Sequence, residues 1–299
     1  MRHLENAFKF TFKNFLLALP LLISLAIPAL ISSVGSVGVV ANSGQFLKNF
    51  QGIMEDIQYG SGGLDYIDMF NKLGLDFGTL IAASAFASFI SLVLTIIVKP
   101  ATYGLINLHF ETGNAKLNDF SKGISKYIGR FILFGLLNIA FAIGIGLVSV
   151  ILVIIAGVVA GAVSPVLGIL LMFLFFVAIV IGCVVLFNYL ALWFPAICIE
   201  DSDVITGLKN SFKQVNGSFW PILGVTIMVT LGGSFVSLIL GAIIGIIPVI
   251  GSVVSPLITG LAQFILIVYY FEVYREKTGR YTLPEPPQQF NDYQQGGVQ

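Results

Sequence analysis

Charged residues are scarce in this chain of 299 residues, because Asp, Glu, Lys and Arg together make up only 10% of it. Soluble domains carry about 25% charged residues, whereas hydrophobic residues reach 57% here and the mean hydropathy is +0.96. Long uncharged runs of this kind need lipid as their solvent, which excludes a water-soluble globule and predicts a multi-pass membrane protein. The 15 basic and 15 acidic residues balance to a net charge of zero, so we expect no nucleic-acid partner.

Cysteine and histidine are also scarce. The two cysteines, Cys183 and Cys198, lie in one apolar stretch, which excludes a disulfide framework. The two histidines, His3 and His109, are far apart in the sequence, and neither His-Glu-x-x-His nor Cys-x-x-Cys occurs. These absences predict no catalytic residues, no metal and no other cofactor, so we expect a protein that is not an enzyme.

Six apolar stretches reach the roughly 20 residues that a helix needs to cross a membrane. They lie at about 15–40, 77–98, 131–160, 166–197, 219–247 and 250–271. Short interruptions at 161–165 and 248–251 predict tight turns between antiparallel helices. The first run is longer than the apolar core of a signal peptide, so we expect it to remain as the first helix. The sequence predicts an all-α polytopic membrane protein with six transmembrane helices.

Lysine and arginine are unevenly distributed about these spans, and basic residues that flank spans stay in the cytoplasm. All but two of the 15 fall on one side, and those two, Lys48 and Lys72, lie in the acidic loop 41–76. We therefore expect a protein of the cell membrane with both termini cytoplasmic and an extracytoplasmic loop 41–76 that holds two short helices. A Pro- and Gln-rich tail, 281–299, is predicted to be disordered after a single membrane domain, 1–280.

The six spans form three hairpins with similar cytoplasmic flanks, which predicts a threefold pseudo-repeat. The segments before the first, third and fifth spans combine basic with aromatic residues. These segments are 8–15, 124–131 and 211–220. Such segments suit amphipathic helices that lie in the membrane plane, and we expect Lys9, Lys126 and Lys213 to bind anionic headgroups.

Each hairpin also returns to the cytoplasm through a span that carries one deep polar residue. Lys99 and Asn188 each stand 12 positions before a glutamate, and Gln263 stands 12 positions before Arg275. If the helices are unbroken, the three side chains lie at one depth, about 18 Å inside the cytoplasmic end, and Asn138 lies at a similar level. Polar groups at such depth face the bundle interior or water, which makes these four residues candidate ligand-binding groups.

Each of these residues has a structural alternative. The helix that contains Lys99 can end at Pro100, so that the ammonium group snorkels to the lipid headgroups. Asn138, Asn188 and Gln263 can instead hold the bundle together through interhelical hydrogen bonds, worth on the order of 0.6–2 kcal/mol each. The sequence leaves both alternatives open.

Two local patterns predict packing and capping. Gly157-xxx-Gly161 is typical of helices whose backbones approach closely. The acidic segment 200–203 precedes a short cytoplasmic helix, and either Ser202 or Asp203 is predicted to cap its free N–H groups.

The segment 192–200, LWFPAICIE, resembles a broad bacterial and archaeal family of multi-pass membrane proteins of mostly unassigned activity. The segments 204–212 and 216–220 share the resemblance, as does the aromatic-then-basic close of the last span, 269–275. That family includes the membrane domain fused to some glycerophosphodiester phosphodiesterases. The resemblance is clearest over about 185–280, and it implies a helical architecture without catalytic residues.

The leading functional hypothesis is an integral membrane protein that binds or translocates a lipid or other amphiphile through a polar cavity in the cytoplasmic half of the bundle. The deep polar residues and the basic, aromatic flanks favour it. The alternative is a membrane scaffold or accessory subunit that recruits a protein partner, or a second copy of the chain, through loop 41–76 or the cytoplasmic helices. The expected partners are therefore membrane lipids and either another protein or a second copy of this chain.

Overall fold

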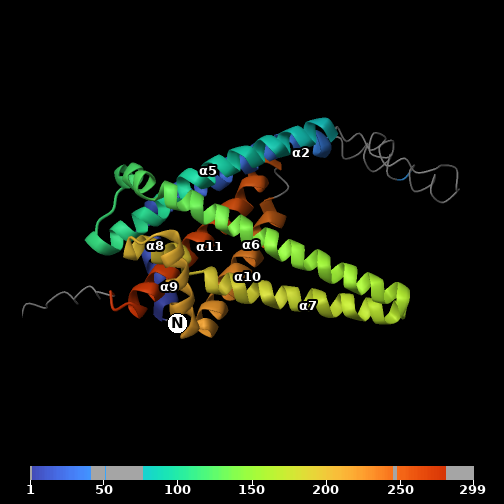
Figure 1. The fold of residues 1–299 in the computed structure, drawn as a ribbon. Helices are drawn as coiled ribbons and strands as arrows, with labels where there is room; N and C mark the ends of the chain where they lie inside the picture. The colour runs from blue at the N-terminus through green and yellow to red at the C-terminus, as the bar shows by residue number, and fades with distance from the viewer. Residues whose placement is uncertain (1, 42–50, 52–76, 245–247, 281–299) are drawn as a thin grey trace, which may run out of the picture.

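The computed structural model describes residues 2–41, 51, 77–244 and 248–280, and these residues form helices and no strand (Figure 1). The two helices expected in loop 41–76 lie outside the described residues apart from Gln51, and so does the expected tail 281–299. The helices are α1 (Arg2–Lys13), α2 (Leu19–Ala41), α5 (Phe77–Thr112), α6 (Phe120–Ala162), α7 (Pro165–Leu190), α8 (Trp193–Glu200), α9 (Val204–Asn216), α10 (Phe219–Ile244) and α11 (Pro248–Lys277). The prediction of an all-α fold is confirmed for the described residues.

Five helical segments in the described part of the chain are long and apolar enough to cross a membrane. They are Ile81–Thr112, Leu117–Ala162, Pro165–Glu200, Phe219–Ile244 and Gly251–Lys277. The apolar helix Leu19–Ser33 within α2 is shorter. These lengths are those of a multi-pass membrane protein, as the composition predicts.

The long helices pack as pairs: α2 lies on α5, α6 on α7, and α10 on α11. Contacts of α5 with α6 and of α11 with α2 join the pairs into one bundle. In Figure 1, the α6–α7 pair extends away from the end where α8, α9 and the N-terminus gather. We call that end the base and define it as residues 2–22, 98–131, 190–222 and 260–280.

The two predicted turns differ in outcome. Val163 and Ser164 connect α6 to α7, as the interruption at 161–165 predicts. The second turn, predicted at 248–251, is wrong, because α11 begins at Pro248 and includes Gly251. Proline is tolerated in the first turn of a helix since its missing N–H would have no partner there.

Helix α5 continues past Lys99 and Pro100 to Thr112, so the alternative in which the helix ends at Lys99 is wrong. A proline inside a helix removes one backbone hydrogen bond. The residues that follow compensate by burial in the base, where Leu105 and Ile106 are 1% and 0% exposed. The packing of this segment therefore outweighs the local cost of the proline.

Two of the three predicted amphipathic flanks are separate helices, α1 and α9. The middle flank, 124–131, is instead the beginning of α6, a helix of 43 residues. Its expected break is absent because no proline interrupts it and because Tyr127 and Phe131 are buried in the base.

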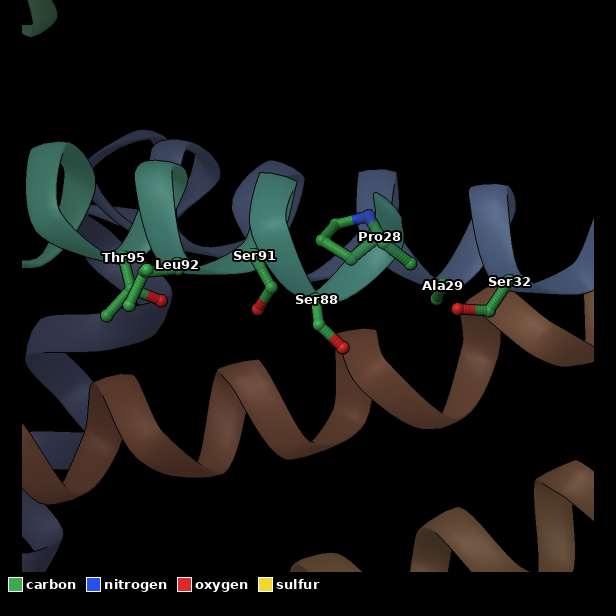
Figure 2. Close-up of a pocket in the computed structure, with 8 residues that line it drawn as sticks. Pro28, Ala29, Ser32, Ser88, Ser91, Leu92 and Thr95 are labelled. Carbon is green, nitrogen blue, oxygen red and sulfur yellow. The ribbon is translucent and has the colours of Figure 1, made fainter. Parts of the chain in front are cut away.

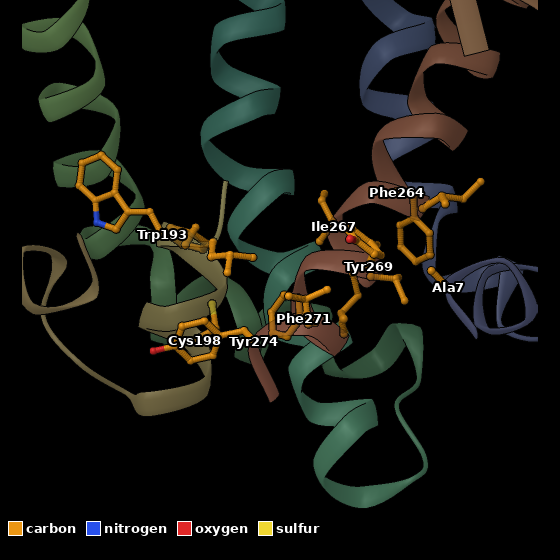
Figure 3. Close-up of a cluster of buried hydrophobic side chains, with 14 of the residues drawn as sticks. Ala7, Trp193, Cys198, Phe264, Ile267, Tyr269, Phe271 and Tyr274 are labelled. Atoms are coloured by element: carbon orange, nitrogen blue, oxygen red, sulfur yellow. The ribbon is translucent and has the colours of Figure 1, made fainter. Parts of the chain in front are cut away.

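The core of the protein lies in the base (Figure 3). Phe194 meets Phe131 edge to face, with ring centroids 5.2 Å apart. The Trp193 indole donates a hydrogen bond of 2.7 Å to the Val204 carbonyl, which fixes α8 against the start of α9. The largest side chains with less than 2% exposure are Trp193, Tyr274, Phe194, Phe264 and Phe271. Burial of each such side chain contributes about 1.5–3 kcal/mol.

Close backbone contacts occur at other glycines than the ones predicted. A Cβ added to Gly157 or Gly161 meets no atom within 4 Å, so the Gly-xxx-Gly prediction is wrong. In contrast, a Cβ on Gly104 would lie 2.8 Å from the Gly123 Cα, where α5 crosses α6. Gly168 is similarly crowded against α6.

Candidate functional site

Asn188 lies in the last turn of α7 and is 5% exposed. Its Nδ2 donates a hydrogen bond of 3.0 Å to the carbonyl of Phe219, where α10 begins. This is the interhelical role that the sequence leaves open for Asn188. Its Oδ1 is buried and has no hydrogen-bond partner among the described residues. Leaving a buried acceptor unpaired costs about 1–3 kcal/mol, which makes this oxygen a candidate contact for a ligand.

Thr226 of α10 and Tyr270 of α11 form a second polar group nearby. The Thr226 Oγ1 and the Tyr270 Oη are 2.8 Å apart. The Thr226 hydroxyl also lies 2.7 Å from the carbonyl of Ile222, one turn earlier in the same helix. The pair therefore joins α10 to α11 beside the end of α7.

Asn188, Thr226 and Tyr270 line one cavity of about 430 Å³, which we call the Asn188 cavity. Its other lining residues are Val184, Phe187, Ala191, Leu223, Ile227, Thr230 and Leu231. None of the ten lining residues is acidic or basic. An apolar pocket with a few convergent polar groups is the usual form of a small-molecule site.

Sequence reasoning found Asn188 but missed Thr226 and Tyr270. A signal was present, because Thr226 and Thr230 are spaced by four and share one face of α10. Tyr270 belongs to a run of aromatic residues that we assigned to the close of the last span. Neither pattern says that the two residues face Asn188, which depends on how the three helices are rotated.

The other three predicted ligand-binding residues do not line the Asn188 cavity. The Asn138 side chain donates to the Phe134 carbonyl of its own helix at 2.8 Å. Lys99 and Gln263 are partly buried on α5 and α11. In the described part of the chain, no hydrogen bond joins any of these three to Asn188. A ligand role for Lys99, Asn138 and Gln263 therefore stays a prediction.

The depth argument that grouped these residues is wrong for Asn188. Helix α7 ends at Leu190 and α8 begins at Trp193, so Asn188 and Glu200 do not belong to one helix. The physical reason is Pro195, which has no N–H to donate to the carbonyl of the residue four positions earlier. Helices α5 and α11 are continuous over the corresponding lengths.

Two further hollows lie between paired helices. The first, about 490 Å³, is lined by residues of α2 and α5 (Figure 2). Ser88, Ser91 and Thr95 line it along one face of α5, opposite Pro28 and Ser32 of α2. None of its polar side chains is nine-tenths buried, so it lacks the feature that distinguishes the Asn188 cavity.

The other hollow, about 460 Å³, lies between α6 and α7. Its walls are apolar or glycine, including Gly144 and Gly182, and its single sulfur belongs to the partly buried free thiol Cys183. Because no nitrogen or oxygen of a side chain lines this groove, it offers no group that would orient a polar ligand.

The three lysines predicted to bind headgroups stand on α1, α6 and α9, and they differ in their partners. The Lys9 ammonium lies 2.6 Å from a carboxylate oxygen of Glu5, and that of Lys126 lies 3.6 Å from Asp201. Lys213 has no ion pair among the described residues. Exposed pairs of this kind contribute about 0–1 kcal/mol, so Lys9 and Lys126 remain accessible to competing anions.

Polar contacts in the base join segments that are far apart in the sequence. The Tyr274 hydroxyl donates a hydrogen bond of 2.5 Å to Glu200. His3 Nε2 lies 2.5 Å from a carboxylate oxygen of Glu276, which fastens α1 to the end of α11. The described residues contain no group of three or more His, Cys, Asp and Glu side chains that could hold a metal ion. The contacts of Tyr274 and His3 hold these segments of the base together.

The other two carboxylates of the acidic segment 200–203, Asp201 and Asp203, bind different partners. Asp203 caps α9 by accepting hydrogen bonds of 3.1 Å from the N–H groups of Ile205 and Thr206, which confirms one of the two predicted caps. Hydrogen bonds from Thr206 lower the pKa of Asp203. Arg130 pairs with Asp201 and lowers the pKa of that carboxyl group as well.

Comparison with known proteins places the chain in a family. Residues 25–276 match a domain of unknown function, DUF7847. The chain belongs to this family. No curated protein and no solved structure matches it. The DUF7847 match extends over the residues that line the Asn188 cavity, and the family description names no activity.

Proposed function

We propose that this protein binds a lipid or other amphiphile in the Asn188 cavity. The single observation that carries the proposal is the buried, unpaired Oδ1 of Asn188, a residue that lines a largely apolar cavity. An apolar chain fits the walls formed by residues such as Phe187 and Leu223, and a polar end fits beside Asn188. A wholly polar solute would leave those walls in contact with polar atoms.

Access from the lipid phase supports the same ligand class. Three lining residues are strongly exposed on the surface of the bundle: Phe187 at 61%, Ile227 at 45% and Leu231 at 64%. In a membrane these apolar side chains contact acyl chains, because lipid is the solvent on that surface. An amphiphile can therefore reach the cavity sideways, without crossing water.

The proposal includes the topology that the sequence predicts. Six spans in three pseudo-repeated hairpins, with both termini cytoplasmic in the cell membrane, put the base and the neighbouring cavity in the cytoplasmic half of the bundle. Lys9, Lys126 and Lys213 then stand where anionic headgroups gather. The resemblance of 185–280 to the membrane domain fused to some phosphodiesterases agrees with a lipid-facing role and gives no reason to propose hydrolysis.

A cavity-filling substitution tests the proposal. The full chain, purified in detergent, is incubated with a photoactivatable long-chain alcohol that carries a diazirine on its chain, and the labelled peptides are identified by mass spectrometry. Leu223→Trp fills the cavity, so we expect labelling of its lining residues to fall at least fivefold. Leu238→Trp is the matched control, since Leu238 lies on the same helix, is 70% exposed and does not line the cavity.

Equal thermal stability of the two variants shows that both remain folded. Unchanged labelling in folded Leu223→Trp would overturn the cavity proposal and leave the scaffold alternative as the better hypothesis. Loss of labelling in both variants equally would also count against a specific site, because it would mean that the probe reports only the surrounding detergent.

A further inference from the structure

The polar atoms around the Asn188 cavity have protons that can be assigned one by one. An Asn side chain has two N–H donors on Nδ2 and an acceptor on Oδ1. One of the two N–H groups of Nδ2 donates to the Phe219 carbonyl, which holds the amide in this orientation. Oδ1, by contrast, has no hydrogen-bond partner at all among the described residues, and it only accepts hydrogen bonds.

The Thr226 and Tyr270 hydroxyl groups both donate their single protons to hydrogen bonds within the protein. A threonine hydroxyl has one proton, and the partner at 2.7 Å is the Ile222 carbonyl, which cannot donate. Thr226 must therefore donate to Ile222. The contact of 2.8 Å between the two hydroxyls is then donated by Tyr270 to Thr226. What these two residues still offer to a ligand is lone pairs.

The surroundings provide no charge to balance an ionised ligand. The lining residues include no Lys or Arg that would compensate a phosphate or carboxylate, and no Asp or Glu that would compensate an ammonium group. The fourth polar lining residue, Thr230, is exposed and can both donate and accept. Burying an unpaired charge among acceptor oxygens and apolar walls is strongly unfavourable.

From this proton assignment we infer that the Asn188 cavity selects an amphiphile whose polar end is an uncharged hydrogen-bond donor. This donor is a hydroxyl or an amide N–H, and it donates its proton to Asn188 Oδ1. The inference rests on the proposed function and adds the chemistry of the ligand's polar end. Anionic headgroups are excluded from the cavity and left to the lysines of the membrane surface.

Three chain-matched probes test the inference on the purified full chain. They share one diazirine-bearing C16 chain and end in a primary alcohol, its methyl ether or its phosphate monoester. The ether keeps the oxygen but lacks the proton, so the pair of alcohol and ether isolates the donor. We expect the alcohol to label the cavity residues about fivefold to tenfold more than either other probe, as the loss of one buried hydrogen bond predicts.

A variant ties the preference to Asn188. Asn188→Leu removes the acceptor, so alcohol and ether should label the variant equally. This variant also loses the bond to Phe219, and if it does not fold, the comparison of the three probes on the unaltered chain decides by itself. Equal labelling by alcohol and ether, or stronger labelling by the phosphate, overturns the inference while the proposed function stands. If all three probes label Leu223→Trp as strongly as the unaltered chain, the proposed function is overturned instead.

Discussion

The two ends of α6 differ in their surroundings although they belong to one helix. Near its beginning, Tyr127 and Phe131 are 3% and 8% exposed in the base. Farther along, Ile143, Leu147 and Val158 are all more than half exposed, where α6 and α7 extend away from the other helices (Figure 1). The extended part of this pair contacts little besides itself, whereas the base combines parts of most helices.

Among the candidate membrane spans, the most apolar one is the least buried within the protein. None of the most apolar 18-residue window of Pro165–Glu200 is buried, whereas 28% of the corresponding window of Gly251–Lys277 is. In water the more apolar segment would be the better buried one. Lipid removes that driving force between helices, so apolar side chains here indicate contact with membrane, and aromatic and polar contacts indicate the core.

The largest expected effect contrasts the two tryptophans. Trp193 is 0% exposed in the base, and Trp220 is 76% exposed at the start of α10. Trp193→Ala removes a fully buried indole and its hydrogen bond, so we expect the free energy of unfolding to fall by about 3–5 kcal/mol. Trp220→Ala should change it by roughly 0.5 kcal/mol or less.

Unfolding in mixed micelles of mild detergent and dodecyl sulfate measures both values. Similar losses for the two variants would contradict the division between a packed base and a lipid-facing surface.

Glycine substitutions should change stability with opposite signs in the two regions. Gly104→Ala forces a Cβ against the Gly123 backbone in the base, and overpacking of this kind costs about 1–3 kcal/mol. Gly146→Ala meets open space in the middle of α6, where alanine is the better helix former by about 1 kcal/mol. The same unfolding experiment measures both, and destabilisation by Gly146→Ala would show that α6 has a neighbour there.

Capping of α9 gives an intermediate effect within the base. Asp203→Ala removes two hydrogen bonds to backbone N–H groups, so we expect a loss of about 0.5–2 kcal/mol. Ser202→Ala is the control, because the Ser202 hydroxyl has no partner among the described residues. A larger loss for Ser202→Ala, measured by thermal unfolding in detergent, would reverse the assignment of the cap.

The smallest expected effect is a pH dependence at the edge of the base. Arg130 lowers the pKa of Asp201 in the folded state below its ordinary value of 3.8. The pair therefore stabilises the fold above pH 3.8, and this contribution is lost as the pH falls through the lower, folded pKa. Because the Asp201 side chain is 57% exposed, we expect less than about 1 kcal/mol.

Asp201→Asn should remove this contribution, so that the midpoint temperature of unfolding varies less with pH between about pH 2 and 5. Asparagine suits the position, since residue 201 has a left-handed backbone with φ 51°. An unchanged pH profile would mean that the ion pair contributes nothing measurable.

Sequence alone establishes those features that depend on residues close to one another along the chain. Apolar runs mark the long helices, Ser164-Pro165 marks the turn after α6, and the acidic segment 200–203 marks the start of α9 without distinguishing Ser202 from Asp203 as its cap. Local patterns also mislead, as at Gly157, which meets no atom within 4 Å although α7 packs on another face of α6, because the spacing does not say which face meets a neighbour. Asn188 could be found in the sequence because a polar residue stands out in an apolar helix.

Only the tertiary structure decides which residues meet Asn188. Thr226 and Tyr270 are 44 positions apart, and their hydrogen bond depends on the rotation of α10 and α11 about their own axes. In a soluble helix an apolar stripe reveals that rotation. In these spans nearly every face is apolar, so hydropathy has no preferred side, and the packing of the base determines which polar groups share a cavity.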